Sequence, residues 1–147
     1  MKVRALILLM CLTACTPAAF AWSGRPSSPP PKTGTTGAPP PAWIETKTKS
    51  AWLLYGSYCW KTSCVDMIPP ETRPGLPVFT VPRGALVRIH LGFVAKSASI
   101  SVDKKTMRAK LEPAKRVISW HAGRGGILTV FARAAGDVSY VARLRVR

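Results

Sequence analysis

Residues 127–147, ILTVFARAAGDVSYVARLRVR, decide the fold class. Apolar and polar residues alternate on both sides of Gly136-Asp137, and from Tyr140 onward arginines stand between the apolar positions. A period of two is typical of a strand with one buried face, and a Gly-Asp pair between two such runs favours a tight turn. The stretch therefore predicts a β-hairpin made of residues 127–134 and 138–147.

The same alternation recurs upstream of this hairpin. It is clear in two runs, residues 85–93 and 98–103, and shorter candidates are residues 52–60, 78–81 and 116–121. Residues 104–110 are short and basic, and we expect a loop or a single turn there. About seven short strands predict an all-β fold, a small antiparallel β-sandwich in residues 43–147. An immunoglobulin-like topology is one option, although the Cys…Trp…Cys spacing of true immunoglobulin domains is absent.

The N-terminal third has a different composition. Residues 23–42 contain seven of the chain's 14 prolines, together with many glycines, serines and threonines. Such a segment buries too little apolar surface to offset its conformational entropy. We therefore expect residues 15–42 to form a disordered tether with polyproline-II character. A docking site for a partner that recognises polyproline II is the alternative interpretation.

The chain begins like an export signal. Lys2 and Arg4 precede a short apolar run, which is too short to span a bilayer. Leu12-Thr13-Ala14-Cys15 resembles the lipobox of bacterial lipoproteins. The resemblance implies removal of residues 1–14, lipidation of Cys15 and anchoring of an extracytoplasmic protein to the cell membrane. The rival site is Ala19-Phe20-Ala21, where cleavage after Ala21 would release a secreted protein.

Two cysteines remain after the signal. Four residues lie between Cys59 and Cys64 in an exported chain, which predicts a disulfide that contributes about 2 kcal/mol. The spacing is not that of a Cys-x-x-Cys redox pair, and a zinc site would need two further ligands. The stretch Gly56-Ser57-Tyr58-Cys59-Trp60 also resembles a segment of small uncharacterised bacterial lipoproteins, and this resemblance implies no activity.

Positive charge is the most informative feature of the folded part. Residues 43–147 carry 18 Lys and Arg residues against 6 acidic ones, a net charge of +12. We expect a basic surface that binds anionic envelope components, such as anionic lipids or acidic wall polymers. Nucleic acid is disfavoured as a partner by export, and a charge that only keeps strand edges soluble is the alternative. The candidate residues are Lys104, Lys105, Arg108, Lys110, Lys115, Arg116, Arg143, Arg145 and Arg147.

The sequence contains no recognisable catalytic motif, and it predicts no cofactor or metal. The serines lack the Gly-x-Ser-x-Gly context, and six acidic residues leave few candidates for a paired-carboxylate hydrolase. We therefore expect a non-enzymatic binding protein. One alternative is a cell-envelope hydrolase with a cleft beside His121, completed by a serine and by Asp66 or Asp137. Another is an accessory subunit that docks on an envelope protein complex through an apolar patch.

Overall fold

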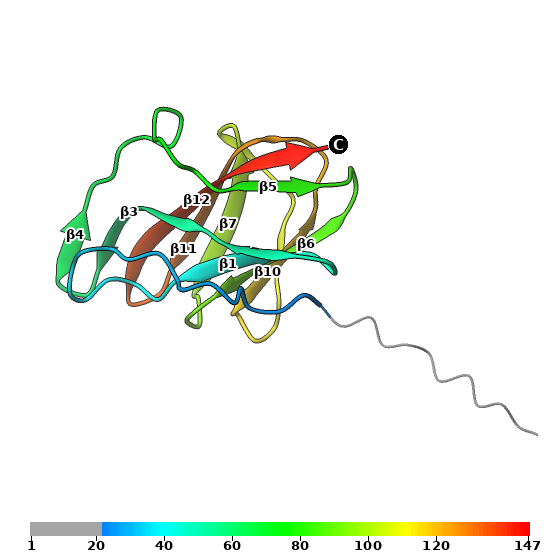
Figure 1. Ribbon diagram of the computed structural model, residues 1–147. Coiled ribbons are helices and arrows are strands. Elements are labelled where there is room, and N and C mark those ends of the chain that lie inside the picture. Colours follow the sequence, from blue (N-terminus) through cyan, green and yellow to red (C-terminus); the bar gives the residue numbers. More distant parts are fainter. Residues whose placement is uncertain (1–21) are drawn as a thin grey trace, which may run out of the picture.

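The computed structural model describes residues 22–147 as an all-β sandwich of two sheets (Figure 1). The predicted fold class is confirmed. The described strands are β1 (Ala42–Glu45), β2 (Ser50–Trp52), β3 (Leu54–Trp60), β4 (Ser63–Val65), β5 (Val78–Val81), β6 (Leu86–Leu91), β7 (Ser97–Val102), β8 (Lys105–Thr106), β9 (Lys110–Leu111), β10 (Val117–His121), β11 (Gly126–Arg133) and β12 (Gly136–Val146).

Sheet A has the order β2-β1-β6-β10-β9, and sheet B has the order β4-β3-β12-β11-β7-β8. Strand β5 joins sheet B by pairing with the end of β12, and this pairing is parallel whereas the others are antiparallel. The order β1-β6-β10-β9 opposite β7-β11-β12 matches the ABED and CFG sheets of an immunoglobulin-like sandwich. Strands β2 to β5 are inserted in the sequence between β1 and β6, the first two strands of the immunoglobulin-like order. Strand β2 extends sheet A, and β3, β4 and β5 extend sheet B.

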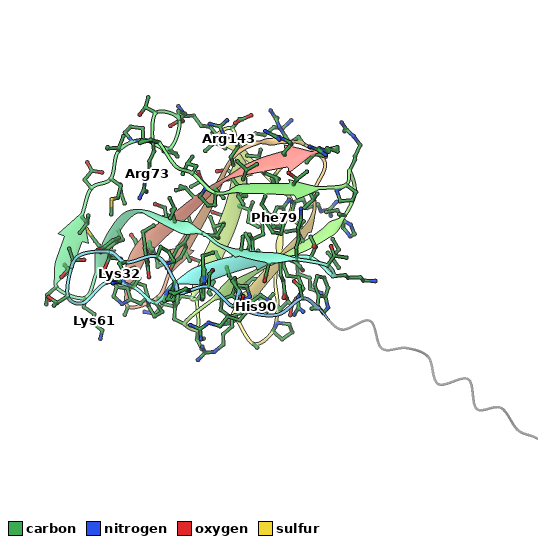
Figure 2. All side chains as sticks on the ribbon, viewed as in Figure 1. Lys32, Lys61, Arg73, Phe79, His90 and Arg143 are labelled. Atoms are coloured by element: carbon green, nitrogen blue, oxygen red, sulfur yellow. A yellow bond between two sulfur atoms is a disulfide. The ribbon has the colours of Figure 1, made fainter. Side chains whose placement is uncertain are left out.

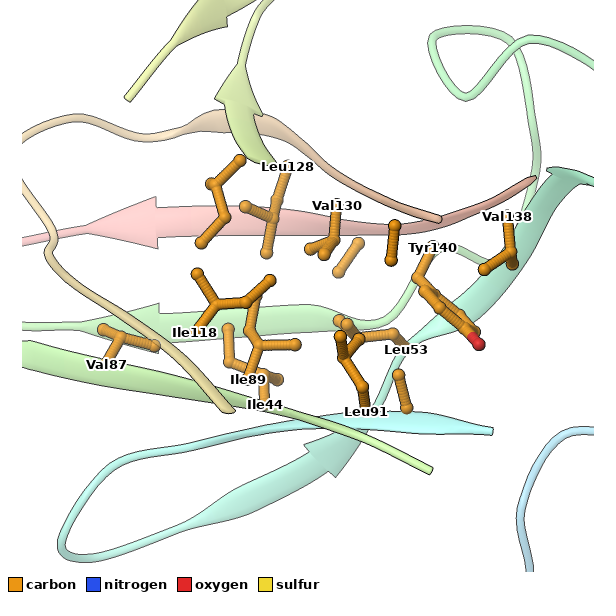
Figure 3. Close-up of a cluster of buried hydrophobic side chains, with 14 of the residues drawn as sticks. Ile44, Leu53, Val87, Ile89, Leu91, Ile118, Leu128, Val130, Val138 and Tyr140 are labelled. Carbon is orange, nitrogen blue, oxygen red and sulfur yellow. The ribbon is translucent and has the colours of Figure 1, made fainter. Parts of the chain in front are cut away.

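The core lies between the two sheets and follows the predicted alternation (Figure 3). Ile44, Ile89 and Ile118 face inward from neighbouring strands of sheet A and are fully buried. Val130 and Tyr140 do the same from sheet B. The predicted C-terminal hairpin is confirmed; Arg133 pairs with Asp137 next to its turn, and β12 already begins at Gly136.

Residues 104–110 do more than form a loop. Asp103 and Lys104 both have positive φ angles, 47° and 65°, and they form the two-residue turn between β7 and β8. A type I′ turn needs this conformation at both central positions. The chain then leaves sheet B and joins sheet A at β9, so this segment links the two sheets.

Residues 22–41 contain no helix or strand, as their composition predicts, but they are not an open tether. Figure 1 shows this segment, in blue, running alongside β1 and then looping beside β4 and β3 before it enters β1. Tyr55 and Tyr140 donate hydrogen bonds to the carbonyls of Pro39 and Pro40, at 2.9 and 2.5 Å. A Cβ atom on Gly92 would lie 2.6 Å from the Pro40 ring, so only glycine allows this approach.

The expectation of an open tether considered only apolar burial. Proline has no N–H, so a proline-rich segment forms few hydrogen bonds of its own, and its carbonyls are available to outside donors. The hydroxyl groups of buried tyrosines are such donors, and they hold the segment against the sandwich.

Candidate functional site

An open groove of about 770 Å³ lies beside β8, β9 and β10. Four cationic side chains line it, together with His121 and Ser119 of β10 and apolar atoms of Trp120 and Leu86. No carboxylate of residues 22–147 lines this groove. The cations, which we call the groove cations, are Lys105, Arg108, Lys110 and Arg124.

The local fold explains why these side chains meet. The β7–β8 turn places Lys105 at the start of β8, and the crossing to sheet A carries Arg108 to Lys110 of β9. Lys110 pairs in register with Ser119 of β10, so both lie on the outer face of sheet A. Arg124 comes from the loop that follows β10.

Most acidic side chains of residues 22–147 pair with cations that do not line the groove. Of the nine basic residues singled out in the sequence, all are exposed, and only Lys104 has an ion pair within residues 22–147, with Glu71 at 3.3 Å. The Glu71 backbone amide and the Lys104 ammonium donate to this carboxylate and lower the pKa of Glu71. Arg124 pairs with Asp103 at 3.8 Å. Lys105, Arg108 and Lys110 therefore carry uncompensated charge into the groove.

The nine basic residues do not form one surface, because two of the six that are close in sequence between residues 104 and 116 lie apart from the groove. Lys115 and Arg116 precede β10, whereas the part of β10 that lines the groove begins at Ser119, about 10 Å from Arg116 along the strand. The turn between β9 and β10 reverses the chain and separates residues that are close in sequence. The carbonyls of Lys115 and Arg116 accept hydrogen bonds from Ala95 and Leu91 at that opposite end.

Arg143, Arg145 and Arg147 form a separate exposed row. They alternate with buried residues of β12, as predicted, and β5 pairs with this part of the strand. The row belongs to sheet B, whereas His90 belongs to the outer face of sheet A, and Figure 2 shows Arg143 and His90 near opposite margins of the molecule.

His121 lines the groove, as the hydrolase alternative requires, but the predicted acids do not. Its Nδ1 atom donates to the Gly84 carbonyl at 3.0 Å. Asp66 and Asp137 line a different groove, beside the disulfide, where Asp66 accepts a hydrogen bond from Ser57 at 2.7 Å. The described residues therefore do not bring a serine, His121 and either of these aspartates together.

The predicted disulfide is confirmed. Cys59 and Cys64 are directly opposite each other on β3 and β4, with their Cα atoms 4.0 Å apart, and they are bonded. The bond closes the β3–β4 hairpin at the edge of sheet B.

Sequence reasoning missed a covered polar cluster on the outer face of sheet A. Glu45 is only 1% exposed, and its carboxylate pairs with His90 and lies 3.7 Å from the Arg88 guanidinium. Arg88 also pairs with Glu112 at 3.2 Å, and the His90 ring stacks on Trp43 with centroids 4.6 Å apart. The alternation of Arg88 and His90 was visible in the sequence, but the pairing of β6 with β1 was not.

Exposed apolar side chains give little support to the accessory-subunit alternative. The large ones among the described residues come from five different elements of the fold, so no single strand presents them as a row. They are Ile68, Val78, Leu86, Val94 and Phe131.

Cys15 and both cleavage motifs lie outside the described residues. Among residues 22–147 there is no helix long and apolar enough to cross a membrane, and no group of three or more His, Cys, Asp or Glu side chains that could hold a metal ion. Comparisons with protein-family models, with curated proteins and with solved structures each found no match.

Proposed function

We propose that this protein is a non-enzymatic extracytoplasmic lipoprotein, anchored by Cys15, whose sandwich binds polyanionic components of the cell envelope through the groove. The observation that carries the proposal is the charge of the groove wall. The groove cations line it without any carboxylate of the described chain, and three of them have no acidic partner. Uncompensated cations in a concave site attract anions and release counterions when an anion binds.

The shape of the groove supports a particular kind of anion. It is open to solvent rather than enclosed, which suits a polymer segment or a row of headgroups better than a small molecule that must be enclosed. Arginine and lysine both recognise phosphate and carboxylate groups. Outside the cytoplasm, such groups are carried by anionic lipids and by acidic wall polymers.

The test compares two triple variants with the same change in charge. One replaces Lys105, Arg108 and Lys110 by Glu, and the control replaces Arg143, Arg145 and Arg147 by Glu on sheet B. Both are made in the chain that begins at Trp22, which retains every contact described above. Binding to purified envelopes, to anionic vesicles and to soluble acidic wall polymer is measured across a salt series.

We expect the parent chain to bind less tightly as salt rises. The groove variant should lose at least about tenfold in affinity at low salt, with a weaker salt dependence, because three cation contacts are removed. The sheet B control should stay close to the parent. Equal losses in the two variants would show a general effect of net charge, and salt-independent binding by the parent would rule out the proposal.

A further inference from the structure

Residues 22–28, which we call the strap, are docked on the outer face of sheet A. The Gly24 amide donates to the buried Glu45 carboxylate at 3.0 Å, and the Ser28 carbonyl accepts a hydrogen bond from Trp52 Nε1 at 2.7 Å. The Arg25 guanidinium lies 5.0 Å from the Trp52 ring centre. At the other end, Arg88 lies 4.7 Å from the Trp22 ring centre. The strap is therefore held along its whole length.

The register of sheet A gives the strap a direction. Ser28 contacts Trp52, whose row across the sheet continues through Trp43 to His90. Trp22 contacts Arg88, which lies in the next row on the same face. One row further, about 7 Å along β6, Leu86 pairs with His121, and both line the groove. Toward its N-terminus, the strap therefore runs in the direction of the groove.

We infer that the strap holds the groove against the bilayer in which the protein is anchored, and that the ligand of the groove is the anionic phospholipid headgroups of that bilayer. The inference rests on the proposed function, including the lipidation of Cys15. It goes beyond that function because it selects lipid headgroups over acidic wall polymers. It also explains the preference for lipid headgroups by the position in which the docked strap holds the groove.

The reach of the chain supports this orientation. Seven residue steps separate Cys15 from Trp22, so a docked strap keeps the sandwich within about 25 Å of the lipid anchor. If the strap is released, the free chain extends to Pro29, its reach doubles to about 50 Å, and its exit direction is no longer fixed. Electrostatic attraction is screened over about 8 Å at physiological salt, so a twofold change in reach determines how often the groove meets headgroups.

The test releases the strap without changing the sandwich. The first variant combines Trp22→Ala with Arg25→Ala. The second is Gly24→Pro, which removes the amide donor to Glu45 and cannot adopt the positive φ of 75° found at Gly24. The matched control is Lys32→Ala, which removes one positive charge, as Arg25→Ala does, from an exposed side chain of the same N-terminal segment.

Two measurements are made on each protein. Amide hydrogen exchange at Ser23, whose N–H donates to the Thr46 carbonyl at 3.3 Å, reports docking in every variant, because Gly24→Pro has no amide hydrogen at position 24. For the full-length lipidated protein in phosphatidylcholine vesicles with phosphatidylglycerol, photo-crosslinking from the phosphatidylglycerol headgroup reports contact with the groove. Both release variants should exchange at least about tenfold faster and crosslink about threefold less than the parent, and Lys32→Ala should match the parent in both measurements.

The outcomes separate this inference from the proposed function. Faster exchange with unchanged crosslinking would overturn the role of the strap, and unchanged exchange in both release variants would overturn its docking. If the unlipidated chain from Trp22 binds acidic wall polymer but not phosphatidylglycerol vesicles, the choice of lipid is wrong although polyanion binding stands. If that chain binds neither, the proposed function itself fails.

Discussion

Two neighbouring regions on the outer face of sheet A differ in whether their charged side chains are paired. On β1 and β6, Arg88 and His90 both pair with Glu45 beneath the strap. Beside β9 and β10, Lys105, Arg108 and Lys110 are exposed and have no acidic partner among the described residues.

The difference follows from the cost of removing a charge from water. A buried carboxylate is tolerated only when it is paired and hydrogen-bonded, whereas an exposed cation can stay unpaired at little cost. The covered cluster therefore stabilises the fold and docks the strap, and the groove is left available for a ligand. The following predictions test this division of roles.

The largest effect is expected from removing the centre of the covered cluster. Glu45→Ala leaves His90, Arg88 and the Gly24 amide without their shared acceptor, and it should lower the free energy of unfolding by about 3 kcal/mol. Urea denaturation followed by tryptophan fluorescence measures this change. Glu112→Ala is the control, because that carboxylate is partly exposed and, among residues 22–147, pairs with Arg88 alone, and it should cost less than about 1 kcal/mol. Similar losses in the two variants would contradict the special role of the buried group.

Alkaline pH should weaken the contacts that hold residues 35–41 to the sandwich. Burial and the neighbouring Tyr58 raise the pKa of Tyr55 to about 12, and burial raises the pKa of Tyr140 further. An unfolded tyrosine has a pKa of about 10, so the stabilisation from Tyr55 is complete below pH 10 and is lost as the pH rises toward 12. Urea denaturation at a series of pH values should show a decrease in stability over this range, and a smaller decrease in Tyr55→Phe. Identical profiles for the two proteins would contradict the assignment.

Removing the hydrogen bond between Tyr140 and Pro40 should lower the free energy of unfolding by a moderate amount. Tyr140→Phe removes the donor to the Pro40 carbonyl, at 2.5 Å, and should cost about 1 kcal/mol. Tyr58→Phe is the matched control, because its hydroxyl contacts the hydroxyl of Thr35, an exposed residue, which can bond to water instead. Thermal unfolding compares the two variants, and a larger loss in Tyr58→Phe would show that the Pro40 carbonyl is not the stronger anchor.

Local patterns in the sequence predicted the elements whose signal is local. The Gly136-Asp137 turn between two alternating runs predicted the hairpin, and the spacing of Cys59 and Cys64 predicted the disulfide. The short strands β1 and β4 were not predicted, whereas β5, which is also four residues long, was. Three or four residues carry a weak periodicity, so strands of this length are detected inconsistently.

Features that depend on strand pairing could not be predicted in the same way. The sequence shows that Lys115 and Lys110 are close neighbours along the chain, but the register of β10 pairs Lys110 with Ser119 in the middle of that strand, whereas Lys115 lies before the strand begins. The hydrogen bond between Tyr140 and Pro40 joins residues 100 positions apart, so no local sequence pattern predicts it. For the same reason, proline content alone predicted an open tether where the chain forms a docked segment.

The smallest change in stability is expected in the groove, where a substitution should affect ligand binding but not folding. Arg108→Ala removes an exposed cation without an acidic partner, so the free energy of unfolding should change by less than about 0.5 kcal/mol. Affinity for the anionic ligand should nevertheless fall several-fold, with a lower salt dependence, since one phosphate or carboxylate contact is lost. Arg116→Ala is the control, because it removes the same side chain at the opposite end of β10 and should change neither quantity. If Arg108→Ala destabilised the protein as much as Glu45→Ala, the groove charges would be structural after all, and the two regions of sheet A would not differ in role.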